Sequence, residues 1–395
     1  MIKDIVALPV WNGKCGRTLR VYVKTENKTF SATAPTGESK GKWEAATISM
    51  AEIAKVFPEL KRLLIGKNET EWDRLDALVE AAGGKDLERI GSLLGTALTM
   101  ALTKAGTNGQ VWQALSDGRS TSFPFPVGNA VGGGAHGGHT SIQEFLVIPA
   151  KAKTMAEAIE TNITVWREIG QTIKAGGNFG RDDEGAWITN ADDVKTLDLV
   201  TNIAEANGCL VGIDVAAGQL MHGNKYVWPS MAREFDSGEQ LEFLKMMAEK
   251  YRLAYIEDPF DARDSMLWAE FNSKSKALVV ADDLACTQPH RVTQIAQAGQ
   301  ANAVIIKPDQ AGTVGKTLRA IDAAKNGRMI HVVSHRGQDT CETFIADLAV
   351  GTEAPLIKCG IAGGERVAKL NRLMEIWAGM SEKGRPEMAR LKLRA

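Results

Sequence analysis

Short apolar runs alternate with amphipathic segments from about residue 123 to the end of the chain. The runs are CLVGID, LAYIED, LVVADD, AVIIK, MIHVVSH and PLIKCG, and helical patterns such as SGEQLEFLKMMAEKY, TVGKTLRAIDAAKNG and GGERVAKLNRLMEIW separate or follow them. Near-continuous apolar strands are typical of parallel strands that are buried on both faces. This number of strand and helix units predicts an α/β fold with a closed (β/α) barrel.

The first part of the chain has a different pattern. Residues 17–24 (RTLRVYVK) and 28–34 (KTFSATA) are rich in β-branched and aromatic residues, which predicts an antiparallel hairpin. Helical patterns follow at residues 43–65, 70–82 and 87–104. Strands followed by helices, without alternation, are typical of an α+β domain. We therefore expect a smaller N-terminal α+β domain over residues 1–118 and the barrel over residues 119–395.

Composition narrows the class of protein and of its partners. The formal net charge of −1 argues against nucleic acid or an anionic membrane as a partner and favours a small molecule. The five cysteines lack the paired spacing of a zinc or redox site, which suits a reducing compartment. The N-terminus shows no apolar core of secretory length, and the longest nearly uncharged stretch, residues 90–103, is shorter than the roughly 18 residues of a membrane span. We expect a cytoplasmic protein.

The apolar runs place titratable side chains at their carboxyl ends. These residues are Asp214, Glu257, Asp282, Lys307, His335 and Lys358. A single lysine at a strand end is more often reaching toward water than serving a site. In a barrel, however, all the carboxyl ends of the strands meet on the one face where such folds carry their chemistry. Six such residues in consecutive strands therefore favour a functional site over a chance arrangement.

The types of these residues suggest a metal and a base. Asp214, Glu257 and Asp282 on neighbouring strands would repel one another unless a cation lay between them, and oxygen ligands suit magnesium. An ion-pair network with Lys307 and Lys358 is the alternative, and it does not exclude a metal. A divalent cation lowers the pKa of a neighbouring lysine, which makes Lys307 a candidate base. A metal beside a base suits proton abstraction from a carbon next to a carboxylate.

The order of motifs in the chain resembles the enolase family. The motifs are VGGGAHGGHTSIQEF, DDEGAW, VGIDVAA, YIEDPFD, VVADDL, IIKPDQAGT, VVSHR, ETFIADLAV and IKCGIAGGERVAKLNRL, and the loop TGESKGKWEA carries a weaker N-terminal likeness. The resemblance implies an enolase-type modified (β/α)8 barrel that starts ββαα, with a smaller N-terminal α+β domain. It also implies magnesium-dependent dehydration of 2-phosphoglycerate to phosphoenolpyruvate. A lysine or histidine base with one or two magnesium ions is the known pattern of this superfamily.

The resemblance further implies catalytic and metal-binding roles. Lys307 would remove the C2 proton, and Glu184 and Glu144 would assist departure of the C3 hydroxyl. The first magnesium ion would be held by Asp214, Glu257 and Asp282. Ser39 would help to ligate a second magnesium ion once substrate is bound. Glu184 in RDDE could instead be a solvated acidic turn, and Ser39 an ordinary loop serine.

Substrate-binding roles follow in the same way. The residues implied are His136, Gln143, His335, Arg336, Gly337 and Lys358. Arg336 would bind the phosphate, Lys358 would lie near the substrate carboxylate, and His136 would lie on a loop that closes. His136 in a run of glycines could equally be a turn residue.

The chain also departs from the family pattern. Gly337 stands where a serine usually meets the phosphate, and Asp309 stands where asparagine is usual. Gly132 replaces an asparagine, Ala186 replaces a glycine, and the loop carries Glu38 and Lys40 in place of small or neutral residues. The stretch WNGKCGRTLRV lacks the family's DSRGNPTVEV pattern in a region that contributes to the dimer interface, although we still expect a homodimer or higher homo-oligomer.

Three hypotheses therefore remain open from the sequence. The first is a phosphopyruvate hydratase that acts in glycolysis. The second is a family paralogue that uses metal-assisted enolisation on another phosphorylated or phosphonylated small acid, which the departures at Gly337 and Asp309 favour. The third is a non-catalytic protein on the same scaffold, which the retained Lys307 and Glu184 disfavour.

Overall fold

The N-terminal part of the chain forms an antiparallel sheet in the order β1-β2-β3. The computed structural model describes residues 1–37, 41–178, 180–381, 384 and 386–391. The sheet strands are β1 (Asp4–Trp11), β2 (Arg17–Lys24) and β3 (Thr29–Thr33). The predicted hairpin is β2 and β3, whereas β1 was not predicted. Pro9 is tolerated there because β1 is an edge strand.

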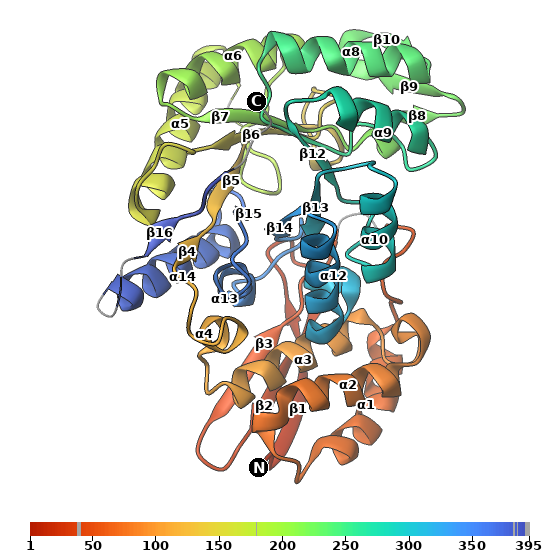
Figure 1. Cartoon of the computed structure of the whole chain (residues 1–395), viewed down its shortest axis with the longest axis vertical. Helices are drawn as coiled ribbons and strands as arrows, with labels where there is room; N and C mark the ends of the chain where they lie inside the picture. Colours follow the sequence, from red (N-terminus) through yellow and green to blue (C-terminus); the bar gives the residue numbers. More distant parts are fainter. Residues whose placement is uncertain (38–40, 179, 382–383, 385, 392–395) are drawn as a thin grey trace.

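The N-terminal helices lie against this sheet at the bottom of Figure 1. They are α1 (Met50–Leu64), α2 (Trp72–Gly83), α3 (Ser92–Gly106) and the short α4 (Val111–Leu115). The prediction of a helix from residue 43 is wrong. The helix begins at Met50 because Ser49 and Glu52 form a capping box, in which each side chain accepts a hydrogen bond from the other residue's backbone N–H.

Helix α3 joins the N-terminal sheet to the barrel. It begins at Ser92 rather than at residue 87, because Leu87 and Gly91 both have positive φ values and residues Lys85–Leu87 form a separate 3-10 turn. Nearly every side chain of α3 is buried, which suits a helix packed on both sides. A Cβ atom at Gly95 would lie 2.6 Å from the carbonyl oxygen of Gly312, so only glycine allows this close approach.

Eight strands close into a barrel in the order β11-β12-β13-β14-β15-β5-β6-β7. In chain order they are β5 (Phe125–Gly132), β6 (Glu144–Ile148), β7 (Leu210–Asp214), β11 (Tyr255–Glu257), β12 (Leu278–Ala281), β13 (Ala303–Ile306), β14 (Ile330–Ser334) and β15 (Leu356–Lys358). Strand β6 is antiparallel to both of its neighbours, and two helices follow it before β7. The barrel therefore starts ββαα, which confirms the modified enolase-type barrel.

Helices surround the barrel in Figure 1. The longer ones are α5 (Met155–Ala175), α6 (Asp193–Ala206), α8 (Ser237–Lys250), α9 (Ser265–Lys274), α10 (Pro289–Gln297), α12 (Val314–Asn326), α13 (Phe344–Gly351) and α14 (Gly364–Ser381). Short elements complete the fold: α7 (Ala217–Leu220), α11 (Pro308–Ala311), the sheet of β8 (Met221–His222), β9 (Lys225–Trp228) and β10 (Arg233–Phe235), and the pair β4 (Ser122–Phe123) and β16 (Glu387–Met388).

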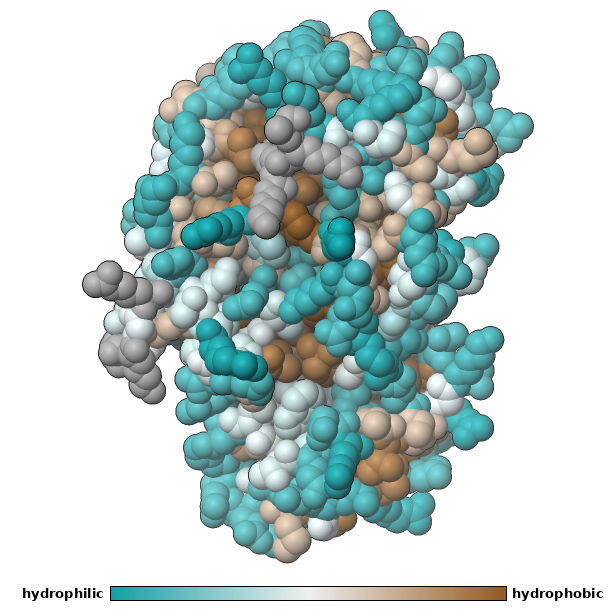
Figure 2. All heavy atoms as spheres, in the orientation of Figure 1, coloured by the Kyte–Doolittle hydropathy of each residue, from teal (hydrophilic) through white to brown (hydrophobic). Residues whose placement is uncertain are grey.

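Hydrophilic residues cover most of the face shown in Figure 2. Among the described residues, none of the helices combines the length and the apolar character needed to span a membrane. The domain boundary near residue 118 stays a prediction.

Candidate active site

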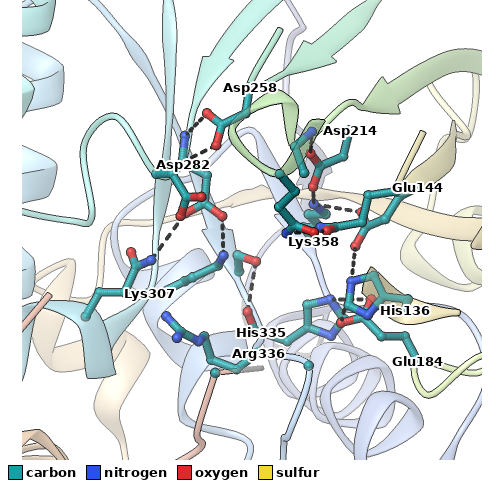
Figure 3. A pocket seen from close by; sticks show the side chains of 18 of the residues that line it. His136, Glu144, Glu184, Asp214, Asp258, Asp282, Lys307, His335, Arg336 and Lys358 are labelled. Atoms are coloured by element: carbon teal, nitrogen blue, oxygen red, sulfur yellow. Dashed lines mark hydrogen bonds and ion pairs between the residues drawn. The ribbon is translucent and has the colours of Figure 1, made fainter. Parts of the chain in front are cut away.

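A cavity lies where the carboxyl ends of the barrel strands meet. The predicted site residues that line it are His136, Gln143, Glu144, Glu184, Asp214, Asp282, Lys307, His335, Arg336, Gly337 and Lys358. Glu257 is fully buried and contacts this group through Lys358. Ser39, together with Glu38 and Lys40, lies outside the described residues. Side chains from distant parts of the sequence therefore converge at the strand ends, as Figure 3 shows.

Lys358 is the centre of a buried charge cluster. Its Nζ lies 2.7 Å from Glu144 Oε2 and 2.9 Å from both Asp214 Oδ2 and Glu257 Oε2. Asp214 and Glu257 are direct partners in the parallel pairing of β7 and β11, so the register itself places the two carboxylates side by side. Burial and the neighbouring Asp214 raise the pKa of Glu257 to about 8. One ammonium group thus faces three buried carboxylates, and the cluster is short of positive charge.

The second ion pair joins Lys307 to Asp282. Lys307 follows β13 and Asp282 follows β12, which pair with each other in the barrel. Burial acts to lower the pKa of Lys307, but the carboxylate of Asp282 outweighs it and the pKa is raised. This is opposite to the lowering expected beside a divalent cation. Asp258 accepts hydrogen bonds from the N–H groups of Asp282 and Asp283, at 2.9 Å each, and so fixes this turn.

These two ion pairs are the network that the sequence left open as an alternative to a metal. The predicted ligands nevertheless fit a divalent cation. Among the described residues, Glu257 Oε1 is buried and has no hydrogen-bond partner. A buried carboxylate oxygen without a partner is costly, and a cation would satisfy it. His136, Glu144 and Glu184 form a second group of the described residues that could hold a metal ion, with ligand atoms within 4.8 Å of one another.

Glu184 and His136 lie across the cavity from Lys307 (Figure 3). Only 3% of Glu184 is exposed, so it is not a solvated turn residue. His136 Nε2 lies 3.7 Å from Glu144 Oε1 and 3.9 Å from Glu184 Oε1, and its Nδ1 lies 2.8 Å from Asp183 Oδ1. Asp183 is in turn paired with Lys14 from the turn between β1 and β2. His136 therefore faces both glutamates and is more than a turn residue.

The two glutamates have opposite protonation preferences. Burial raises the pKa of Glu144 well above its usual value, and Lys358 only partly offsets this. Burial also acts to raise the pKa of Glu184, but the positive charge around it, which includes Arg366 and Lys358, outweighs burial and holds the pKa well below its usual value. The pair can therefore hold one proton on Glu144 while Glu184 stays ionised.

Arg336 is flanked by two carboxylates. Its Nη1 lies 3.1 Å from Glu44 Oε1, and its Nε lies 3.4 Å from Asp309 Oδ2. Glu44 comes from the N-terminal part of the chain, which therefore reaches into the site. Burial raises the pKa of Asp309 to about 6, although the Arg336 guanidinium opposes this. Gly337 offers no side chain here, and its carbonyl oxygen accepts a hydrogen bond from Arg366.

Asp182 contacts two departures from the family pattern, Gly132 and Ala186. A Cβ atom at Gly132 would lie 1.8 Å from Asp182 Oδ2, so no other residue fits there while Asp182 occupies this place. Asp182 Oδ1 accepts hydrogen bonds from the N–H groups of Glu184 and Ala186, at 2.9 and 2.8 Å. Asp182 therefore helps to position the loop that carries Glu184.

Sequence reasoning missed several residues that hold the site together. They are Glu44, Asp183, Asp258 and Arg366 as side-chain partners of the predicted residues. All four lie inside the motifs that carried the resemblance. Their roles depend on contacts between distant segments, for which a single sequence carries no signal.

Comparison with known proteins agrees with this arrangement. Residues 120–389 match the family model described as "Enolase, C-terminal TIM barrel domain". The chain is 35% identical over 388 residues to a protein named Enolase from Archaeoglobus fulgidus, with 95% of this chain and 97% of the relative covered. It is 34% identical over 401 residues to Enolase from Pyrobaculum aerophilum, with 95% and 96% covered. It is 36% identical over 397 residues to Enolase from Haloarcula marismortui, with 95% and 98% covered.

Proposed function

Because the chain belongs to the enolase family, we propose that it converts 2-phosphoglycerate to phosphoenolpyruvate in a magnesium-dependent dehydration. The chain is an enzyme of the lyase class. The observation that carries the specific proposal is the placement of a lysine and a glutamate pair across one cavity. Lys307 follows β13 and Glu144 begins β6, and these strands are four apart in the closed order of eight, hence on opposite sides of the barrel.

Lys307 would be the base that removes the proton from C2. Only its neutral amine can accept a proton, and Asp282 favours the ammonium form in the structure. Lys307 would therefore leave its pairing with Asp282 before it acts. Asp282, the partner of Lys307, is also a proposed metal ligand. Metal binding at Asp282 would therefore change the base strength of Lys307, which supports its role as the base.

Asp214, Glu257 and Asp282 would hold the first magnesium ion, and Ser39 would contribute to a second ion with substrate. When bound, magnesium would stabilise the negative charge that forms on the substrate carboxylate as the C2 proton leaves. The unpartnered Glu257 Oε1 supports this ligand set among the described residues.

Glu144 and Glu184 would serve the leaving group. The C3–O bond breaks, and the departing hydroxyl takes a proton from Glu144 and leaves as water. The raised pKa of Glu144 supports its role as the donor, since burial favours the protonated form of the carboxyl group. The ionised Glu184 lies 3.9 Å from His136 Nε2 and would orient the hydroxyl rather than protonate it.

The remaining predicted residues would bind the substrate. Arg336, His335 and Gly337 are consecutive and line the cavity, which supports their role at the phosphate. Lys358 would lie near the substrate carboxylate, and Gln143 and His136 line the same cavity. A small phosphorylated acid is the substrate class that this set of residues would hold.

The test is a continuous ultraviolet assay for phosphoenolpyruvate formation from 2-phosphoglycerate, with magnesium and again with excess chelator. We expect metal-dependent turnover, and Lys307→Ala should lower kcat by about 10²- to 10⁴-fold, because a positioned base contributes about that much. Calorimetry should find magnesium binding largely intact in this variant. A comparable loss of metal affinity would show that the lysine supports the metal site and is not the base.

A second candidate function has its own supporting observation. Arg336 is flanked by Glu44 and by Asp309, so a dianionic phosphate would meet two carboxylates beside its proposed anchor. The chain would then be a paralogue that acts on another phosphorylated or phosphonylated small acid. Folded protein that binds magnesium but does not turn over 2-phosphoglycerate would favour this candidate, and a panel of phospho- and phosphono-acids would identify the substrate.

A further inference from the structure

A buried arginine on helix α14 contacts three consecutive residues of the proposed substrate site. Arg366 is 0% exposed, and its Nη1 lies 2.7 Å from His335 Nδ1. The same nitrogen donates a hydrogen bond to the Arg336 carbonyl oxygen at 2.6 Å, and Nη2 donates to the Gly337 carbonyl oxygen at 2.6 Å. The planar guanidinium group thus holds a side chain and two backbone carbonyls in one fixed arrangement.

The contact with His335 determines which ring nitrogen carries the proton. A guanidinium group has only N–H donors and no acceptor. His335 Nδ1 must therefore be the acceptor, which places the proton of a neutral ring on Nε2. That nitrogen lies 3.6 Å from Glu184 Oε2. Burial holds the pKa of His335 well below its usual value, and although Glu184 opposes this, Arg366 and Lys358 add to it, so the ring is neutral.

We propose that Arg366 is a positioning residue of this enzyme, which fixes the His335 tautomer so that the Nε2–H group is directed toward Glu184 and the leaving-group side of the cavity. The opposite tautomer would bring the Nε2 lone pair toward a carboxylate oxygen, where the two acceptors would repel. The kinetic part of this inference rests on the proposed function, whereas the tautomer does not depend on any activity.

Helix α14 supplies a matched control in Lys369. This lysine is 1% exposed and is, like Arg366, a buried cation three residues further along the helix. It donates hydrogen bonds to the Thr340 and Glu365 carbonyl oxygens and pairs with Asp339 at 3.0 Å. These contacts hold the end of the same loop rather than the imidazole. If Arg366 served only as a buried cation or as support for the loop, substitution of Arg366 and substitution of Lys369 should therefore have the same effect.

The first measurement is ¹⁵N NMR of protein with labelled histidine, in which a His335→Gln variant assigns the His335 signals. In the wild type we expect an unprotonated Nδ1 and a protonated Nε2. In Arg366→Met this signature should change to a mixture of tautomers or to a charged ring, whereas Lys369→Met should leave it unchanged. A wild-type ring with its proton on Nδ1, or a tautomer unaffected in folded Arg366→Met, would overturn the proposal.

The second measurement is steady-state kinetics with 2-phosphoglycerate. Arg366→Met should lower kcat by about 10²-fold, the loss that a misplacement near 1 Å can cause. Arg366→Lys, which keeps the charge but not the planar fork, should recover part of the tautomer signature and of kcat together. Lys369→Met should keep kcat close to the wild-type value. Equal losses in the methionine variants at both positions would mean that Arg366 only supports the loop.

The outcomes separate this inference from the proposed function. If the wild type does not turn over 2-phosphoglycerate, the proposed function fails, and the NMR measurements still decide the role of Arg366. If the wild type is active and its tautomer is independent of Arg366, the inference alone fails. Should Arg366→Met not fold, the wild-type signature and the Arg366→Lys variant decide the question.

Discussion

At the scale of single residues, Asp309 adds a negative charge beside the proposed phosphate anchor, where the family pattern has asparagine. Its carboxylate lies 3.4 Å from Arg336 Nε, and only 6% of the residue is exposed. Because Glu44 already pairs with Arg336, this second carboxylate leaves the local group with a net negative charge when both are ionised.

Asp309→Asn should therefore strengthen binding of a phosphorylated acid. Removal of one buried negative charge near the anchor is worth about 1 kcal/mol or more at an effective dielectric constant of ~20, which corresponds to a KM lowered by roughly fivefold to tenfold. The measurement is KM for 2-phosphoglycerate in both proteins at one pH above 7. An unchanged KM would show that the phosphate does not approach Arg336.

A hydroxyl at position 337 offers a second way to strengthen the same contact. Gly337→Ser would add a donor next to Arg336, and a hydrogen bond to a charged group contributes about 1.5 to 3 kcal/mol. We expect a lower KM for 2-phosphoglycerate if the phosphate lies beside this loop. A KM that stays the same or rises would place the phosphate elsewhere in the cavity.

Much of the site could be predicted at this scale, for a physical reason. The residues at the ends of parallel barrel strands must converge, so Asp214, Lys307 and Lys358 could be grouped from the strand pattern alone. Their actual partners could not be predicted. That Lys358 pairs with Glu144, and Lys307 with Asp282, depends on side-chain directions and on burial, which a strand pattern does not specify.

At the scale of elements, the joint between α2 and α12 contains a buried carboxylate. Asp76 on α2 is 2% exposed, and its Oδ2 accepts a hydrogen bond from the Gly315 N–H in the first turn of α12 at 2.9 Å. Burial raises the pKa of Asp76 to about 6, even though this hydrogen bond lowers it. A raised pKa means that the folded state binds the proton more tightly than the unfolded state does.

Asp76→Asn should therefore change how stability depends on pH. The contribution of Asp76 to the stability of the wild type is fully present below the pKa of about 4 that it has in the unfolded chain. This contribution is lost as the pH rises through its folded-state pKa of about 6. The asparagine does not ionise and keeps an acceptor for Gly315. The free energy of unfolding of Asp76→Asn, relative to that of the wild type, should therefore rise by up to ~3 kcal/mol between pH 4 and 7. Denaturant titrations at several pH values measure this, and a constant difference would contradict it.

Elements were predicted where their periodicity was strong and missed where tertiary contacts define them. Strands β7, β11, β12, β13, β14 and β15 read as apolar runs and were predicted, whereas β5 and β6 were not. The start of α1 was predicted seven residues too early, because the apolar spacing before Ser49 resembles that of a helix. The capping box at Ser49 sets the actual start of the helix at Met50. The edge strand β1 was missed because its pairing with β2, not its own pattern, makes it a strand.

At the scale of the whole molecule, the proposed active site is assembled from both parts of the chain. The N-terminal part supplies Glu44 to Arg336 and Lys14 to Asp183, and Thr36 forms an isolated bridge with Gln338. Helix α3 also packs closely against the barrel, since a Cβ atom at Gly95 would lie 2.6 Å from the carbonyl oxygen of Gly312. A ligand that binds the site should therefore stabilise the complete fold and not only the barrel.

Magnesium provides the test of this coupling. The Lys358 cluster has one ammonium group for three carboxylates. A divalent cation that binds only the folded state there should raise Tm. At a concentration 100 times Kd the gain is ~2.7 kcal/mol. With an unfolding entropy of ~2.1 cal/mol/K per residue, this corresponds to a Tm increase of about 3 °C for the 395 residues. Thermal unfolding with and without magnesium measures the shift, and excess chelator should reverse it.

Asp282→Asn distinguishes binding at the proposed ligands from general ion effects. The variant removes one carboxylate from the set of Asp214, Glu257 and Asp282 and also releases Lys307 from its ion pair. Its Tm should respond less to magnesium than the wild type does, while sodium chloride at matched ionic strength should affect both proteins equally. An undiminished magnesium response would remove Asp282 from the metal site. The cation would then have to bind elsewhere, with His136, Glu144 and Glu184 as the remaining candidate group among the described residues.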